Sequence, residues 1–118
     1  MRRLPLAAPA ALLLGACATT APVATPAAAP PPDPGLAAVI GKGPDVAIAL
    51  VGPSQLDRRE GDARHLQFAG PACILDLYYY RAEAGNAPVA RYADARRPDG
   101  SPIPAGDCFR LLQAARGA

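Results

Sequence analysis

The sequence contains no tryptophan and few other aromatic residues, which limits the core that it can build. Only two phenylalanines and four tyrosines are present. A core with so few rings is small and largely aliphatic, and a small domain is only marginally stable by apolar burial alone. We therefore expect a covalent staple to contribute to stability. The six aromatic residues are Phe68, Phe109, Tyr78, Tyr79, Tyr80 and Tyr92.

Side chains that carry enzymatic or metal chemistry are equally scarce. His65 is the only histidine, and the hydroxyl side chains of the foldable part other than tyrosine are Ser54 and Ser101, each beside a proline. An enzyme needs a nucleophile or a paired acid and base, and a zinc site needs about four ligands. The sequence therefore predicts no enzyme, no cofactor and no metal site, with His65 as an exposed histidine of a strand.

An excess of charge of one sign is also missing. The formal net charge of +2 comes from Arg2 and Arg3, and without them ten basic residues balance ten acidic ones. This balance does not favour nucleic-acid binding, which needs a basic surface. Asp57, Glu60 and Asp62 cluster near an expected turn. We favour a solvated edge that deters strand addition over a weak cation site.

No apolar run is long enough to cross a bilayer. The run Leu4–Leu14 is shorter than the ~20 apolar residues that a membrane-spanning helix requires. Two arginines precede it, and small residues follow it. These are the charged, apolar and cleavage regions of a secretory signal. The sequence therefore predicts a signal peptide over residues 1–16.

The end of this signal, Leu14-Gly15-Ala16-Cys17, resembles the lipobox of bacterial lipoproteins. The resemblance implies that the Cys17 sulfur receives a diacylglycerol and that its new amino group is acylated, for instance by palmitate. Ala18 lacks the acidic character that signals inner-membrane retention, so we expect a lipid anchor on the periplasmic side of the outer membrane. The alternative is an ordinary signal peptide that leaves Cys17 free.

A tether and a small domain follow the lipobox. Alanine and proline dominate residues 17–35, and the prolines interrupt both helices and strand ladders. We expect this stretch to be a semi-rigid, disordered spacer with a reach of up to ~50 Å. The folded domain is expected over residues 36–118.

The domain begins with the pattern of two short helices. Leu36, Val39 and Ile40 have helical spacing, and Gly43-Pro44-Asp45 is a helix start. The second helix is expected to end at Gly52-Pro53. This predicts an N-terminal helical hairpin, whose apolar side we expect to cover part of the sheet face opposite the C-terminal helix.

Period-two alternation then predicts a three- to four-stranded antiparallel meander, and the chain ends in a helix. The strands are expected over 55–60, 64–68, 73–80 and 89–95, and the helix over 105–116. The predicted fold class is therefore α+β.

Cys73 and Cys108 are an even pair in a chain that the signal directs to an oxidising compartment. Cys73 alternates with Leu75 and Leu77, and Cys108 lies on the apolar stripe of the last helix with Leu112. Both periodicities direct sulfur into the core, which predicts a disulfide that ties this helix to the sheet. Buried free thiols and an incomplete metal site are the alternatives.

The tyrosines divide between the two faces of the sheet. Tyr79 is expected in the core, whereas Tyr78 and Tyr80 share the opposite face, with Tyr92 across from them. Exposed tyrosines beside an arginine such as Arg91 are typical of binding surfaces. Cross-strand packing is the other explanation for these rings.

Two stretches carry a resemblance to known lipoproteins. The helical pattern that ends in Leu50-Val51-Gly52-Pro53 before a meander resembles the SmpA/OmlA (BamE-like) domain, without the residue that this family has between Gly and Pro. The stretches 59–68 and 73–80 resemble uncharacterised alphaproteobacterial lipoproteins. The resemblance implies a non-enzymatic, membrane-anchored module that binds a protein in outer-membrane assembly or envelope integrity. A periplasmic inhibitor or ligand-binding lipoprotein, similar to lysozyme inhibitors, is the alternative.

Overall fold

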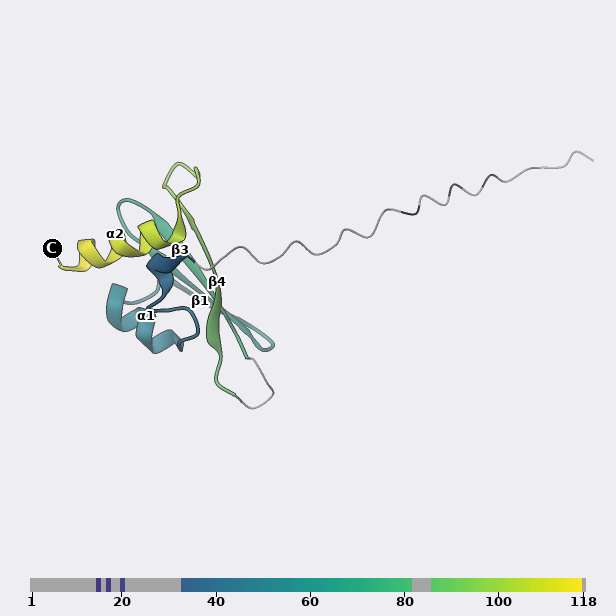
Figure 1. The fold of residues 1–118 in the computed structure, drawn as a ribbon, viewed down its shortest axis with the longest axis horizontal. Coiled ribbons are helices and arrows are strands. Elements are labelled where there is room, and N and C mark those ends of the chain that lie inside the picture. The colour runs from purple at the N-terminus through teal and green to yellow at the C-terminus, as the bar shows by residue number, and fades with distance from the viewer. Residues whose placement is uncertain (1–14, 16, 18–19, 21–32, 82–85, 118) are drawn as a thin grey trace, which may run out of the picture.

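The computed structural model describes residues 15, 17, 20, 33–81 and 86–117 and has the predicted α+β architecture. Two α-helices lie on one side of a four-stranded antiparallel sheet (Figure 1). The elements are the 3-10 helix η1 (Pro34–Leu36), α1 (Pro44–Val51), β1 (Leu56–Glu60), β2 (Ala63–Ala69), β3 (Ile74–Tyr80), β4 (Val89–Arg96) and α2 (Ala105–Gly117).

The expected N-terminal helical hairpin is not confirmed, because its first arm is only the three-residue η1 and one further turn. Leu36 and Val39 are buried as their spacing predicts. Beyond them the chain turns at Gly41 (φ 78°) and pairs with the edge of the sheet. The Gly41 amide donates to the Ala90 carbonyl at 2.7 Å, and the Ala90 amide donates to Lys42 at 2.9 Å. Pairing with β4 thus replaces further helical hydrogen bonds.

Asp33, which precedes the expected domain boundary at Leu36, is hydrogen-bonded to the domain. The Asp33 carboxylate accepts hydrogen bonds from the amides of Gly35 and Gly106, each at 2.8 Å. These two backbone donors hold the pKa of Asp33 below its ordinary value, with the Gly35 amide the larger cause. Asp33 therefore caps η1 and the start of α2 together, which fixes the end of the predicted tether to the domain.

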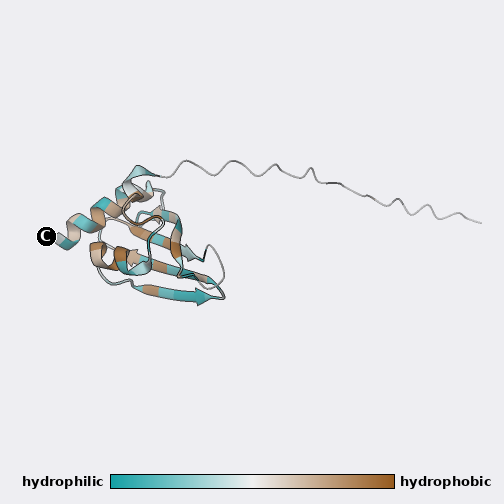
Figure 2. Cartoon of the chain, turned by 60° about the horizontal axis from the view of Figure 1, so that its bottom comes forward, coloured by the Kyte–Doolittle hydropathy of each residue, from teal (hydrophilic) through white to brown (hydrophobic). Residues whose placement is uncertain are grey.

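The second helix and the strands form as the sequence predicts. Gly43 precedes α1 and Pro44 opens it, while Gly52 ends it with a φ of 95° that favours glycine. The strands follow the spatial order β1-β2-β3-β4, with antiparallel pairing throughout. Strand β1 is hydrophilic apart from its start, as the lower strand of Figure 2 shows. Strands that follow one another in the chain are therefore neighbours throughout the sheet, as in the predicted meander.

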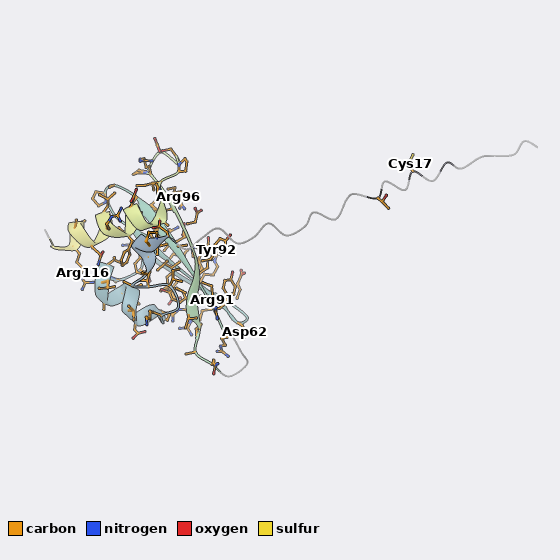
Figure 3. All side chains as sticks on the ribbon, viewed as in Figure 1. Cys17, Asp62, Arg91, Tyr92, Arg96 and Arg116 are labelled. Carbon is orange, nitrogen blue, oxygen red and sulfur yellow. A yellow bond between two sulfur atoms is a disulfide. The ribbon has the colours of Figure 1, made fainter. Side chains whose placement is uncertain are left out.

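One face of the sheet carries the core, and both helices pack on it. Ala47 of α1 belongs to the same buried cluster as the inward residues of α2 and the sheet. Arg116 near the end of α2 donates to the Ile48 carbonyl of α1 at 2.8 Å (Figure 3). The expectation that the N-terminal segment covers part of the other sheet face is therefore wrong. The buried side chains of the core face are Leu66, Phe68, Cys73, Leu75, Leu77, Tyr79, Ala90, Ala95, Cys108, Phe109 and Leu112.

The predicted disulfide is confirmed. Cys73 and Cys108 are bonded with an S–S distance of 2.09 Å and a Cα–Cα distance of 5.8 Å. Both residues are fully buried. The bond joins α2 to the start of β3 across the core, between positions 35 residues apart in the sequence.

Tyr79 lies in the core, as expected, and its buried hydroxyl has no hydrogen-bond partner among the described residues. Its exposed fraction is 0%, and its hydroxyl is the buried side-chain polar atom without a hydrogen-bond partner in the described part of the chain. Burial raises the pKa of Tyr79 to about 12, and the charge of Arg64 opposes that rise. The phenol therefore stays neutral and acts as an apolar filler.

Candidate binding surface on the open face of the sheet

Within the described part of the chain, no helix covers the second face of the sheet (Figure 1), which we call the open face. The pairing register decides which side chains meet there. Tyr78 lies between His65 of β2 and Tyr92 of β4, and Asp76 lies between Gln67 and Asp94. The open face includes His65, Gln67, Asp76, Tyr78, Tyr80, Tyr92, Asp94 and Arg96.

The structure brings together the three tyrosines that the sequence assigns to a binding surface. Tyr92 has an exposed fraction of 62% and Tyr80 one of 44%, so both rings face solvent. Tyr78 is half-buried because its ring stacks on His65, with centroids 4.5 Å apart and planes inclined by 12°. Two exposed rings and one supported ring therefore form a continuous aromatic surface.

Arg91 lies at the margin of this surface. The β3–β4 register shifts at Tyr78 and Tyr79, so Arg91 is the extra residue of a bulge between the paired residues Ala90 and Tyr92. Its side chain is exposed, and Arg91, Tyr92 and Arg96 follow one another along β4 (Figure 3). Arg91 is thus adjacent to the tyrosines in the chain but is not part of the grooves described below.

A buried carboxylate supports the open face, and the sequence analysis missed it. Asp76 has an exposed fraction of 3%. It contacts His65 Nε2 at 2.7 Å and accepts from Gln67 Nε2 at 2.8 Å and from Arg96 Nη1 at 2.7 Å. The prediction of a freely exposed His65 is wrong, because its side chain is 22% exposed and is held between Asp76 and Tyr78.

This network gives the surface a rigid base. Asp76 can accept several hydrogen bonds, and three side chains from the neighbouring strands surround it. The His65 ring that it positions is also the ring on which Tyr78 stacks. Alternation along each strand places His65 and Gln67 on one face of β2 and Asp76 on one face of β3. The pairing register of the two strands is also needed to show that these side chains meet. The chain therefore holds the tyrosine surface in place through a polar network on the same face.

Two grooves flank the Tyr78–Tyr80 row. The Tyr92 groove has a volume of about 360 Å³ and is lined by Tyr78, Tyr80, Tyr92, Ala93 and Asp94. The Arg58 groove has a volume of about 390 Å³ and is lined by Arg58, Glu60, Ala63, Arg64, His65, Tyr78 and Tyr80. Both are open depressions that suit side chains of a partner.

Two of the three acidic residues near the β1–β2 turn, Asp57 and Asp62, are paired with arginines. Arg64 binds Asp57 through two hydrogen bonds of 2.9 and 2.8 Å, which lowers the pKa of Asp57. Arg81 lies 3.7 Å from Asp62. Within the described residues, no group of three or more histidine, cysteine or acidic side chains is placed to hold a metal ion.

Replacing Arg96 with methionine is expected to lower the free energy of unfolding by roughly 2–3 kcal/mol, because the buried Asp76 loses its cationic partner. Urea denaturation measures this change. The control is Arg110→Met, which removes an exposed pair with Asp107 and should cost about 0–1 kcal/mol. Equal effects of the two substitutions would contradict the structural role of Asp76.

Comparison with known proteins finds no matching family model, no matching curated protein and no matching solved structure. In the described ranges, no helix has the length and apolar character needed to pass through a bilayer.

Proposed function

We propose that this protein is a non-enzymatic, lipid-anchored module of the bacterial envelope that binds a protein partner through the open face of its sheet. The observation that carries the proposal is the row of three adjoining tyrosines on a face without a covering helix. Aromatic residues are enriched at protein interfaces, where they bring large contact areas at low entropic cost.

The membrane anchor is the first part of the proposal. The Leu14–Cys17 motif supports lipidation, and Cys17 is exposed and unbonded, as the modification requires. With Ala18 next to it, the anchor is assigned to the periplasmic side of the outer membrane. Asp33 is hydrogen-bonded to the start of α2, so in this proposal the chain between Cys17 and Asp33 sets the distance of the domain from the membrane.

The second part is a role in outer-membrane assembly or envelope integrity. It is supported by the resemblance of the Leu50–Pro53 turn and the following meander to the SmpA/OmlA (BamE-like) domain. In this proposal, η1 with its turn and α1 correspond to the two arms of that family's helical hairpin, joined through Gly41–Gly43. The partner is then a component of the assembly machinery or of the cell envelope.

A periplasmic inhibitor or ligand-binding lipoprotein is the second candidate. The observation that favours it is the buried disulfide Cys73–Cys108 in a small domain, a feature shared with lysozyme inhibitors. The two functions differ in the partner that they require. An outer-membrane β-barrel or a peptidoglycan-linked protein indicates the assembly role, and a secreted hydrolase indicates the inhibitor.

The proposal predicts that alanine at Tyr78, Tyr80 or Arg91 reduces co-purification of the partner from detergent-solubilised membranes by roughly tenfold or more, the loss typical of an interface hot spot. Mass spectrometry identifies the partner. The thermal midpoint of the Tyr80 and Arg91 variants should stay within a degree or two, because both side chains are exposed. Tyr78 stacks on His65, so a moderate loss of stability is expected there. Full recovery of the partner by all three variants would place its binding site elsewhere.

A further inference from the structure

The Tyr92 groove combines aromatic rings with one acidic side chain. Tyr78, Tyr80 and Tyr92 supply three rings, and Asp94 supplies a carboxylate. Tyr78 and Tyr92 are direct cross-strand partners. Because the strands are antiparallel, Tyr80 on β3 and Asp94 on β4 lie on opposite sides of this pair along the strands. The face of an aromatic ring attracts cations, and cages of such rings bind cationic groups in proteins.

The acidic charge of the groove has no salt-bridge partner within the described part of the chain. Asp94 is exposed and forms no salt bridge with any described residue. The nearest arginine on β4, Arg96, is engaged by Asp76 at 2.7 Å. No arginine or lysine is among the lining residues. A cation that entered the groove would therefore meet negative charge without displacing an existing partner.

Besides burial, the raised pKa of Tyr78 reflects the same negative charge. Burial is the larger cause that raises the pKa of Tyr78, and the charges of Asp76 and Asp94 raise it further, against the opposing charge of Arg96. Negative charge thus acts on a ring of the groove. The Arg58 groove on the other side of Tyr78 differs, because two arginine residues, Arg58 and Arg64, are among its lining residues.

We propose that the Tyr92 groove binds an arginine side chain of the partner protein. This inference rests on the proposed function, and it specifies the chemistry that the open face recognises. A guanidinium group is planar, so it stacks on tyrosine rings and offers paired N–H donors to a carboxylate. The exposed tyrosines provide the stacking surface, and Asp94 provides the acceptor.

The tyrosines themselves report on this binding. The chain has four tyrosines and no tryptophan, and three of the four line the groove. The fourth, Tyr79, is buried on the core face and serves as an internal reference. We would label the tyrosine rings of the full chain with carbon-13, hold the protein in an uncharged maltoside detergent and titrate the end-blocked tripeptide Gly-Arg-Gly. The ring signals of Tyr78, Tyr80 and Tyr92 should shift in a saturable manner, and the signal of Tyr79 should not.

Two comparisons make the test specific. The same tripeptide with citrulline keeps the shape of arginine without its charge, and it should bind about tenfold more weakly. Asp94→Asn should weaken the arginine peptide by about fivefold or more, whereas Asp62→Asn, at an exposed carboxylate outside the groove, should leave its affinity unchanged. Equal binding of the citrulline peptide, a shift of Tyr79 with the others, or no shift at all would overturn the proposal. Tighter binding of tetramethylammonium than of the arginine peptide would also overturn it, in favour of a quaternary amine.

The peptide titration and the co-purification test two separate claims, so either claim can be wrong while the other holds. If the open-face variants lose the partner and the arginine peptide does not bind, the arginine assignment is wrong and the proposed function stands. If the peptide binds as described and the variants retain the partner, the groove is a cation site and the proposed function is wrong.

Discussion

Reduction of the Cys73–Cys108 disulfide is expected to lower the melting temperature of the protein by roughly 15–30 °C. The bond joins residues 35 positions apart, and closing a loop of that length stabilises the folded state by ~4 kcal/mol in the chain-entropy model. A domain of this size shifts its midpoint by about 4–8 °C for each kcal/mol. The effect is large because the core contains few aromatic side chains.

Calorimetry of the full chain with and without reductant measures this shift, and thiol titration of the unfolded protein verifies that reduction is complete. A double variant, Cys73→Ala with Cys108→Ala, should reproduce the reduced melt. Alanine is preferred over serine because both positions are fully buried and a hydroxyl would need a partner there. An unchanged midpoint after verified reduction would show that apolar packing alone holds α2 on the sheet.

The second large effect concerns the anchor. Cys17→Ser is expected to move the protein from the membrane fraction to the soluble fraction, because serine cannot receive the thioether-linked lipid. Each buried methylene contributes about 0.8 kcal/mol to membrane binding, and two or three acyl chains anchor a protein stably where a single chain holds it only marginally. Fractionation of cells followed by detection of the protein measures the change.

Ala18→Asp is the matched variant for this experiment. It keeps the cysteine that we propose is lipidated and introduces the aspartate that signals retention in the enterobacterial lipoprotein rule, so we expect the protein in the inner membrane and not in the proposed outer membrane. A Cys17→Ser protein that still sediments with the outer membrane would contradict the lipid anchor. It would also leave partner binding as the only membrane attachment.

Local patterns were sufficient to predict most of the fold. The Gly43-Pro44 and Gly52-Pro53 pairs correctly mark the two ends of α1. Proline is favoured at the first helical position, and glycine is favoured just after the last one. Cys73 and Cys108 were placed in the core by two independent periodicities, one of a strand and one of a helix. Such signals depend on neighbours in the chain, and tertiary contacts did not override them.

The features that sequence reasoning missed depend on contacts between distant segments. Asp76 meets Arg96 only through the β3–β4 register, which is set by a connection whose geometry the sequence does not specify. The bulge at Arg91 shifts that register by one residue. The turn after Leu36 was interpreted as a helix because its spacing is helical, but pairing of Gly41 and Lys42 with Ala90 supplies competing hydrogen bonds. The sheet face on which α1 packs is likewise decided by how the helices pack on the sheet as a layer, and no local pattern specifies this.

The open face is therefore a site that the sequence predicted in part. Tyr78, Tyr80 and Tyr92 were assigned to one surface because strands alternate, and the structure brings them together. Their support by His65 and Asp76 was not predicted, because each polar residue alone has an ordinary explanation as a solvated side chain. The grooves beside the tyrosines were not predicted either, since their shape depends on three strands at once.

The central claim is that the open face, and not the helical side, binds the partner. The most direct measurement compares Tyr92→Ala with Leu111→Ala in the same co-purification from solubilised membranes. Both side chains are large, present apolar surface and are exposed, at 62% for Tyr92 on the open face and 42% for Leu111 on α2. We expect Tyr92→Ala to lose about nine-tenths or more of the partner and Leu111→Ala to retain it. Loss of the partner with Leu111→Ala and its full recovery with Tyr92→Ala would contradict the account.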